Sequence, residues 1–440
     1  MKPIVHGNIV DIHVELIAVK SLREDALRII EDSISSVLPE RAVEQELRKL
    51  DLGDKIYLVA IGKAAWRMAK SAKDCLKDKV KGGVVITKYG HSQGPIEGLK
   101  IYEAGHPIPD ENTISSTKEA VELAKGLSKD DTVLFLVSGG GSALFELPVD
   151  GVSLEDIKNV TDMLLRCGAN IVEINAIRKR MSQVKGGRFA LMASPAKVCS
   201  LVLSDVLGDR LDSIASGPAY HDSTTVEDVR KIIRKYDLKL SKHILQSLSE
   251  ETPKSLDNVE TRIIGSVSKV CESARNVAAS LGYNAMILTT TLDCEASEAG
   301  LFLAAIAREE VEKERPIKRP CAIILGGETV VHVKGTGKGG RNQELVLSAA
   351  RGIRNYQGVV IASVGTDGTD GPTDAAGGIV DGRTATLLEE AGIDIDDVLN
   401  DNDSYHALQK VNSLIRTGPT GTSVNDLIFI LCDETKVREN

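Results

Sequence analysis

The stretch Val133–Ser142 reads VLFLVSGGGS, five apolar residues followed by three consecutive glycines between two serines. The continuous apolar run Val133–Val137 predicts a β-strand that is buried on both faces, as the strands of a parallel sheet are. Glycines directly after such a strand let the backbone turn sharply and let its amides approach a ligand closely. The stretch therefore predicts an α/β fold with a ligand-binding loop after this strand.

Further apolar, β-branched runs repeat this pattern along the chain. They are Ile56–Ile61, Gly83–Ile86, Val198–Leu203, Ala285–Leu288, Ala322–Leu325, Val359–Ala362 and Leu427–Leu431. Helical patterns lie between them, as at Leu16–Leu38 and Glu111–Leu127, and a capping-box pattern predicts that another helix begins after Ser153. This alternation of strands and helices predicts parallel sheets covered by helices.

The domain organisation follows from a chain of 440 residues, a length that accommodates two or three domains. A polar stretch with little periodicity, Leu238–Glu260, separates two groups of strand and helix patterns and is the candidate linker. We therefore expect two α/β domains: residues 1–250 with a Rossmann-like three-layer parallel sheet, and residues 251–440 with a smaller α/β fold. Whether the last segment packs back on the first domain is left open.

Composition favours a small anionic ligand over a polymer. With 63 acidic and 54 basic residues the net charge is −9, so no general basic field is available to hold nucleic acid. Only 3% of the residues are aromatic, which disfavours base-stacking platforms. The seven cysteines include no C-x-x-C pair, which disfavours a zinc or redox motif and favours buried thiols in a reducing compartment.

No stretch approaches the roughly 20 apolar residues that a membrane helix requires. The N-terminal sequence MKPIVHGNIVDIHVE also lacks the charged and then apolar pattern of a signal peptide. We expect a cytoplasmic protein with neither a membrane nor a nucleic acid as its partner.

Small or charged residues follow several of the predicted strands, at the edge where open α/β sheets bind ligands. These segments are Gly62-Lys63-Ala64, Ser204–Asp209, Gly326-Gly327-Glu328 and the glycine–aspartate run Gly365–Gly382, GTDGTDGPTDAAGGIVDG. Glycine amides and a lysine suit phosphate groups, and clustered carboxylates suit a hard cation. Several such segments together point to an anion and a metal ion rather than to turns alone.

The segment Ser138–Ser142, called the glycine-rich loop below, would cradle a phosphate if its amides open a helix. A tight turn between strand and helix is the alternative. The pattern G-x-x-x-x-G-K-[ST] occurs nowhere, which excludes a P-loop. The dinucleotide pattern G-x-G-x-x-G fails as well, because Leu144 occupies the place of its third glycine.

Two basic segments are further candidates for anion binding. Arg341 follows Gly337-Lys338-Gly339-Gly340 and precedes a helical pattern at Leu345–Arg351, so its charge opposes the helix dipole unless it faces an anion. A surface arginine is the alternative, as a surface lysine is for Lys63. Lys185-Gly186-Gly187-Arg188 is either an anion site or the continuation of a solvated basic helix, Asn175–Arg180.

The carboxylates Asp205, Asp209, Asp367, Asp370 and Asp374 are candidate magnesium ligands or general bases. Turn or helix-cap duty is the alternative for any one of them. The role of His106, in GHPIPD, is left open between structure and function.

Taken in order, these motifs resemble the glycerate 2-kinase family of the two-domain α/β type. The matching segments are AIGKAA (60–65), AGHPIPDE (104–111), SGGGSAL (138–144), KGGR (185–188), SDVLGD (204–209), IASGP (214–218), LGGE (325–328), GKGGRNQE (337–344), GTDGTDGPTDAAGGIVDG (365–382), NDSY (402–405) and TGPTGTSVNDL (417–427). The resemblance covers about residues 15 to 432. Two positions depart from it: Arg180, where the family often has histidine, and Ser423, where asparagine is common.

The resemblance implies phosphorylation of D-glycerate by ATP with a divalent metal such as Mg²⁺, typically at the 2-hydroxyl. It also implies an active site in the cleft between the domains, with Lys63 and Arg341 in it. Two rival functions are weighed against this one: an NAD(P)H-dependent hydroxypyruvate reductase, which lacks its dinucleotide fingerprint here, and a non-catalytic phosphometabolite-binding protein. Monomer and homodimer are both left open.

On this reading each candidate residue has a predicted role. Lys63, Arg341 and Asp205 are predicted to be catalytic, with Asp205 as the base that accepts the hydroxyl proton. The predicted phosphate-binding residues are Ser138, Gly139, Gly140, Gly141, Ser142, Gly337, Lys338, Gly339 and Gly340. The predicted metal ligands are Asp367, Asp370 and Glu328. Asp374 and Asp381 are predicted to be structural.

Overall fold

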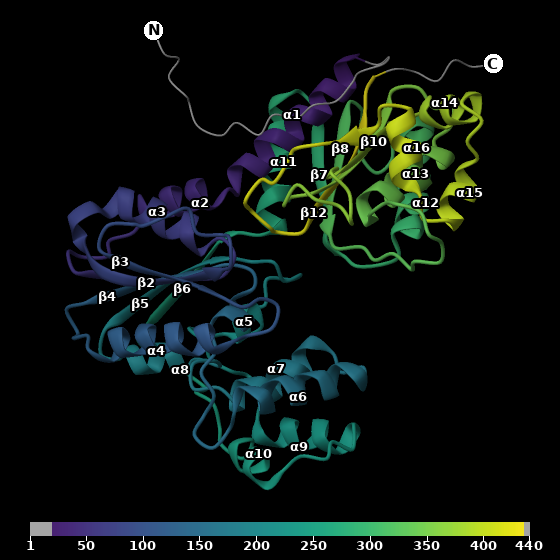
Figure 1. Ribbon diagram of the computed structural model, residues 1–440. Coiled ribbons are helices and arrows are strands. Elements are labelled where there is room, and N and C mark those ends of the chain that lie inside the picture. Colours follow the sequence, from purple (N-terminus) through teal and green to yellow (C-terminus); the bar gives the residue numbers. More distant parts are fainter. Residues whose placement is uncertain (1–19, 435–440) are drawn as a thin grey trace. The chain divides into compact units, whose positions relative to one another are not determined.

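The computed structural model describes residues 20–434, which form two compact units (Figure 1). The central unit is Pro39–Ile264, and the terminal unit combines residues 20–38 with residues 265–434. This division differs from the predicted one, because the boundary follows Ile264 instead of residue 250 and the first helix belongs with the C-terminal half. Residues 1–19 lie outside the described residues. They include the start of the first predicted helix, residues 16–19, and the N-terminal sequence that lacks a signal-peptide pattern.

The central unit is an α/β structure with one six-stranded sheet. Its strands are β1 (Ile56–Ile61), β2 (Val80–Lys88), β3 (Leu99–Ala104), β4 (Thr132–Val137), β5 (Lys197–Leu203) and β6 (Val259–Gly265). Its helices are α2 (Pro39–Leu47), α3 (Ala65–Leu76), α4 (Glu111–Lys125), α5 (Gly141–Leu144), α6 (Leu154–Arg166), α7 (Ile171–Arg180), α8 (Arg188–Ala193), α9 (Val226–Lys235) and α10 (Lys242–Ser247). Two 3₁₀ turns cover Lys77–Lys79 and Ile214–Ser216.

The central sheet has the strand order β3-β2-β1-β4-β5-β6, which is the order of a doubly wound Rossmann fold. The pairs β3–β2, β2–β1, β1–β4 and β4–β5 are parallel. Ile61, the last residue of β1, pairs with Val137, the last residue of β4, so the two strands end level. The order of strands reverses between β1 and β4, and the Rossmann-like prediction is confirmed.

Alternate residues of each strand face opposite helical layers, which explains the continuous apolar runs. Leu58 and Leu134 pack in the cluster that contains α3, while Val59 and Phe135 pack in the cluster that contains α4 and α8. Figure 1 shows α2 and α3 on one side of this sheet and α4 and α8 on the other. The three-layer prediction is therefore confirmed.

The predicted linker, Leu238–Glu260, is instead part of a small helical module. It contains α10, and its residues Leu238, Ile244 and Leu248 are buried in a cluster with α6, α7 and α9. Ile244, Leu245 and Leu248 have the i, i+1, i+4 spacing of one short helix, but the polar residues around them hid this signal. The linker prediction was wrong for that reason.

The terminal unit contains a second six-stranded sheet. Its strands are β7 (Asn284–Leu292), β8 (Cys321–Gly327), β9 (Val359–Gly365), β10 (Gly377–Asp381), β11 (Leu414–Ile415) and β12 (Asp426–Cys432). Its helices are α1 (Lys20–Ser36), α11 (Val267–Ser280), α12 (Ala296–Lys313), α13 (Arg341–Gly352), α14 (Thr384–Glu390), α15 (Ile395–Asn400) and α16 (Ser404–Lys410). Between residues 20 and 434, no helix has both the length and the apolar run needed to span a bilayer.

The second sheet is mainly antiparallel, in the order β11-β10-β9-β12-β8-β7. Only the β7–β8 pair is parallel, so the prediction of parallel strands was wrong here. The continuous apolar runs of β8, β9 and β12 report burial on both faces, and helices on both faces produce that burial whatever the strand direction. The run in the edge strand β7 is only partly buried. β12 lies inside the sheet between β8 and β9, which places the last described segment in the terminal unit.

The junction of β1 and β4 predicts a stability difference between two glycine variants. Gly62 and Gly53 both have positive φ, +111° and +72°, but a Cβ on Gly62 would overlap the side chain and carbonyl of Ser138, whereas a Cβ on Gly53 meets nothing within 4 Å. We expect Gly62→Ala to lower the unfolding free energy by about 1–3 kcal/mol more than Gly53→Ala does, because overpacking adds to backbone strain. Urea unfolding of the two variants checks this, and equal losses would contradict it.

Candidate functional site

The loops that follow β1 and β4 are joined by hydrogen bonds at the edge of the central sheet. The Lys63 amide donates to the Gly139 carbonyl over 2.9 Å, and the Ala64 amide donates to Ser138 Oγ over 3.1 Å. The Ser138 amide donates to the Ile61 carbonyl over 3.0 Å. Doubly wound sheets bind ligands where the strand order reverses, which is here. The structure thus brings the predicted Lys63 and the predicted glycine-rich loop together.

His106 lies beside the same loop. A Cβ atom on Gly140 would come within 2.9 Å of the His106 ring and 3.3 Å of Lys63 Cγ, so both side chains pack against this glycine. Burial lowers the pKa of His106, and the nearby positive charge of Lys63 lowers it further. Histidine in a proline-containing loop gave no decisive signal in the sequence, and only the fold places it at the candidate site.

Asp205 reaches the glycine-rich loop from the neighbouring strand. It follows β5, which pairs with β4, so the two loops share one edge of the sheet. Its carboxylate lies so close to Gly139 that a Cβ there would overlap it. A larger residue at position 139 would displace this carboxylate, so the predicted base lies next to the predicted phosphate-binding loop.

The glycine-rich loop differs from the prediction in one respect. The helix that it opens, α5, has only four residues, too few to supply the aligned peptide dipoles expected at a helix N-terminus. The amides of Gly140 and Ser142 have no acceptor among the described residues. Any phosphate binding here consequently depends on individual amides and on the charge of Lys63.

The basic side chains Lys179, Arg180 and Lys185 are buried. The predictions of an open anion site and of a solvated basic helix are therefore both wrong for these residues. Lys179 and Arg180 are 1% and 0% exposed and pair with Asp222, at 3.0 and 3.4 Å. Lys185 is also 0% exposed, and its ammonium group lies 3.2 Å from Glu146 Oε2. Burial lowers the pKa of Lys185 to about 8, although Glu146 opposes the shift. These cations are internal ion-pair partners, not a solvated helix or an open anion site.

In the terminal unit, Arg341 begins α13 and is held by two carboxylates. Its Nε and Nη2 donate to the two oxygens of Asp426 over 2.6 and 2.9 Å, and Nη1 lies 3.1 Å from Glu328 Oε1. These carboxylates offset the unfavourable position of the charge at the helix start. A guanidinium group has five N–H bonds, so donors remain for a ligand on a side chain that is 33% exposed.

Asp426 is a site residue to which sequence reasoning gave no role. It is the first residue of β12 and lies opposite Gly327 of β8 and Gly365 of β9. Burial raises its pKa to about 6, although the bidentate contact with Arg341 opposes the shift. One feature of the sequence could have indicated this role: Asp426 directly precedes the apolar run Leu427–Leu431, where a strand begins, and it belongs to the motif TGPTGTSVNDL.

Asp370 has a structural role that differs from the predicted metal ligation. Its Oδ1 accepts hydrogen bonds from the Asn342 amide (3.1 Å) and Nδ2 (3.2 Å), and its Oδ2 accepts from the Gln343 amide and Nε2, both at 2.9 Å. The side chain is buried, and burial raises its pKa against these hydrogen bonds. Both oxygens are thus occupied in capping the first turn of α13.

Asp367 and Glu328 retain more freedom than Asp370. Asp367 Oδ1 accepts from the Thr369 amide and hydroxyl at 2.9 and 3.0 Å, as in an Asx turn, while no described residue donates to its Oδ2. Glu328 Oε2 accepts from Asn425 Nδ2 over 2.9 Å, and the side chain is 45% exposed. Over residues 20–434, no three His, Cys, Asp or Glu side chains are grouped to hold a metal ion. The predicted trio of metal ligands is therefore not assembled as such a group.

The segment Gly337–Gly340 is packed against a neighbouring loop, so its predicted phosphate contacts lose support. The Gly337 amide donates to the Asp401 carbonyl and the Lys338 amide to Asp403 Oδ1, both over 2.9 Å. A Cβ on Gly339 would overlap Ser404, and one on Gly340 would overlap Asp370. Close packing against Ser404 and Asp370 explains these two glycines without a ligand.

Asp374 and Asp381, predicted to be structural, have protein partners. Asp374 accepts from the Tyr405 hydroxyl over 2.7 Å and from Arg416 Nε over 3.0 Å. Asp381 forms a buried ion pair with Arg23 of α1 at 2.7 Å. The glycine–aspartate run is therefore mostly framework, and its last residues form β10.

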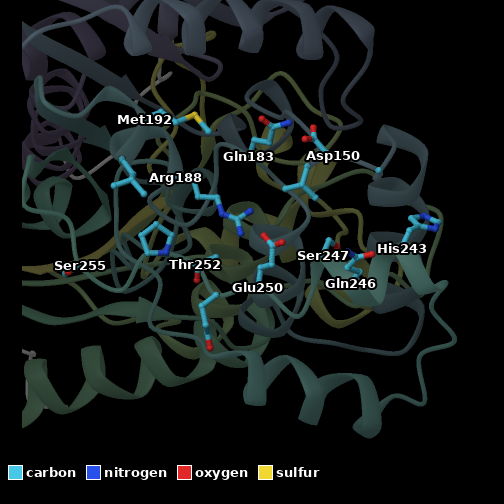
Figure 2. Close-up of a pocket in the computed structure, with 15 residues that line it drawn as sticks. Asp150, Gln183, Arg188, Met192, His243, Gln246, Ser247, Glu250, Thr252 and Ser255 are labelled. Carbon is cyan, nitrogen blue, oxygen red and sulfur yellow. The ribbon is translucent and has the colours of Figure 1, made fainter.

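A separate cavity of about 870 Å³ lies in the central unit between α8, α10 and the loop after α10 (Figure 2). Arg188, Glu250 and His243 are among the residues that line it. The predicted residues Lys63, Asp205 and the glycine-rich loop do not line it. This cavity is distinct from the edge of the sheet described above.

The capping role of Asp370 predicts that Asp370→Asn destabilises the protein without any metal present. An asparagine can accept through only one atom, so two of the four donors lose their partner. We expect a loss of at least about 2 kcal/mol in unfolding free energy, measured by urea unfolding in EDTA. Asp367→Asn is the matched control, because Oδ1 is retained, and it should stay within about 0.5 kcal/mol of the wild type. An unchanged stability of Asp370→Asn in EDTA would refute the cap.

Two family models match the chain. A model described as a domain of unknown function (DUF4147) covers residues 25–249, and one described as the MOFRL family covers residues 321–426. The two matches cover most of the central unit and the strands of the terminal unit from β8 to the start of β12.

Several relatives match over nearly the whole chain. A D-glycerate 2-kinase from Thermotoga maritima is 59% identical over 93% of this chain and 98% of the relative, and a glycerate 2-kinase from Pyrococcus horikoshii is 45% identical over 95% and 99%. The crystal structure of a Thermotoga maritima glycerate kinase superposes with a TM-score of 0.91 at 59% identity, covering 94% of this chain and all of that one. The chain therefore belongs to the glycerate 2-kinase family.

Proposed function

We propose that this protein transfers the γ-phosphoryl group of ATP to the 2-hydroxyl of D-glycerate, giving 2-phosphoglycerate and ADP. The observation that carries the proposal is the meeting of Lys63, the glycine-rich loop and Asp205 where the strand order reverses. Two relatives, 59% and 45% identical, are named D-glycerate 2-kinase and glycerate 2-kinase, which supports the acceptor and its hydroxyl.

Lys63 and the glycine-rich loop are assigned to the ATP phosphates. The Lys63 side chain is exposed, and the nearby amides of Gly140 and Ser142 have no acceptor among the described residues. An ammonium group and unpaired amides at one place are suited to a phosphate chain. In a protein with a net charge of −9, such local donors are needed to hold ATP.

Asp205 is assigned as the base for the acceptor hydroxyl. As the 2-hydroxyl oxygen bonds to the γ-phosphorus, the bond from that phosphorus to the bridging oxygen of ADP breaks, and Asp205 accepts the hydroxyl proton. The position of Asp205 beside Gly139 supports this role, because a base must lie close to the phosphate that is transferred.

Arg341 is assigned to the transferring phosphoryl group or to the glycerate carboxylate, with Asp426 fixing its orientation through two hydrogen bonds. A magnesium ion, when bound, would neutralise phosphate charge. Mg²⁺ typically uses one or two carboxylates together with substrate phosphates. Asp367, whose Oδ2 accepts from no described residue, and the partly exposed Glu328 fit that donor set, whereas both oxygens of Asp370 are already bonded.

The assigned charges predict a large loss of activity in two variants. We expect Lys63→Ala and Arg341→Lys each to lower kcat/KM for ADP formation by about 10²–10³-fold, because phosphoryl transfer depends on positioned charge and a lysine cannot reproduce the bidentate grip. Lys118→Ala, an exposed lysine of α4, and Arg351→Ala, at the other end of α13, are the matched controls and should stay within about twofold. A near-normal kcat/KM in Lys63→Ala or Arg341→Lys removes that residue from the mechanism.

The identity of the product tests the proposed function itself. With ATP, Mg²⁺ and D-glycerate, phosphorus NMR should show 2-phosphoglycerate and ADP in equal amounts, and no turnover should occur when EDTA replaces Mg²⁺. A 3-phosphoglycerate signal would overturn the assignment of the hydroxyl. NADH oxidation with hydroxypyruvate would instead support a reductase, and tight binding of phosphate esters without turnover would support a non-catalytic binding protein.

A further inference from the structure

We propose that Lys185, Arg178 and Glu146 form a buried clamp that positions the glycine-rich loop for ATP. The three side chains do not touch the substrate in this proposal, and they act through the backbone of the loop. The proposal rests on the proposed function in one respect, the assignment of the loop to the ATP phosphates.

The clamp is centred on the Ser142 carbonyl, which ends the glycine-rich loop. This oxygen accepts hydrogen bonds from Lys185 Nζ over 3.0 Å and from Arg178 Nη2 over 3.1 Å. Lys185 Nζ also donates to the Phe145 carbonyl over 2.6 Å. Two cations, one from α7 and one from the segment that follows it, thus converge on one carbonyl next to the amides assigned to phosphate.

The short helix after the loop explains why this support is needed. Four residues form α5, and a helix of one turn is not stable by itself. The last carbonyls of a helix have no partner within it and need donors from elsewhere. Lys185 and Arg178 supply those donors from the protein interior, where water is not available to replace them.

One buried carboxylate, Glu146, lies near both cations of the clamp. Glu146 is 0% exposed, and its Oε2 lies 3.2 Å from Lys185 Nζ and 3.9 Å from Arg178 Nη2. Its Oε1 accepts from the Leu147 amide over 3.1 Å. Apolar side chains can stabilise a protein core as well as buried ion pairs do. Stability alone therefore does not account for these three buried charges, whereas the need to hold the loop in one defined geometry does.

A second set of contacts holds the loop from the other side. Ser142 Oγ lies 3.1 Å from Ser216 Oγ, which donates to Asn175 Oδ1 over 3.0 Å. Ala215 and Ser216 are buried and have left-handed φ values of 51° and 61°, which non-glycine residues rarely adopt. Such strain persists where the surrounding structure enforces it and is common at functional sites.

ATP affinity measured by calorimetry, together with KM and kcat, tests the clamp. We expect Lys185→Met to weaken ATP binding and raise KM for ATP at least tenfold, with less than a twofold change in KM for D-glycerate. Lys179→Met is the matched control: it lies on the same helix as Arg178 and breaks a buried ion pair with Asp222, away from the Ser142 carbonyl. It should lower stability without changing ATP affinity.

The triple variant Lys185→Met/Arg178→Met/Glu146→Gln separates positioning from mere stability. It leaves no buried charge in the clamp, so its unfolding free energy should exceed that of Lys185→Met/Arg178→Met, which leaves Glu146 without either cation, while ATP affinity stays low in both variants. Recovery of both stability and affinity in the triple variant would overturn the clamp, as would an equal loss of affinity in Lys179→Met. Wild-type protein that binds ATP without phosphorylating D-glycerate would refute the proposed function alone, since the affinity comparison would still test the clamp. Wild-type protein that does not bind ATP would refute both.

Discussion

The hydrogen bonds between the loops after β1 and β4 are the constraint on which the candidate site depends. They form because two parallel strands end level, with Ile61 opposite Val137, and because Gly62 leaves room for Ser138. This pairing joins two strand-to-helix connections into one surface that carries Lys63 and the Gly140 and Ser142 amides, which have no acceptor between residues 20 and 434. The neighbouring strand β5 then adds Asp205 to the same edge.

Buried carboxylates have the corresponding role in the terminal unit. Asp370 caps the first turn of α13 and thereby fixes where the helix begins. Arg341 is the first residue of that helix, and Asp426 of β12 holds its guanidinium group in one orientation. An arginine at a helix N-terminus is unfavourable in isolation. The two hydrogen bonds to Asp426 stabilise Arg341 there, while part of its guanidinium group stays exposed.

Much of the fold could be predicted because burial on both faces leaves a strong local signal. All eight apolar runs are strands, the helix predicted from Glu111 begins there as α4, and the helix after Ser153 begins where its capping box indicated. The signal failed where burial is one-sided or glycine replaces branched residues. β3 (LKIYEA) and β6 (VETRIIG) mix charged and apolar residues, and β10 (GGIVD) lies hidden in the glycine–aspartate run.

The candidate site was predicted less completely, because the same residue type serves as ligand or as framework. Lys63, the glycine-rich loop and Asp205 do meet, as expected from strands that end at one edge. Asp370 and Gly337–Gly340 looked equally suited to ligands, but their polar groups are already bonded within the protein. His106 and Asp426 were found only through neighbours distant in the chain.

The sequence by itself determined the local features of this protein: its buried strands, its helix starts, its glycine-containing loops and its membership of a kinase family. These features depend on residues that are close together in the chain. Tertiary structure alone decided which carboxylates and cations remain available, because that choice depends on partners far apart, such as Asp370 with Asn342 or Lys185 with Ser142. It also decided strand direction in the second sheet, since two-sided burial looks the same in parallel and antiparallel strands.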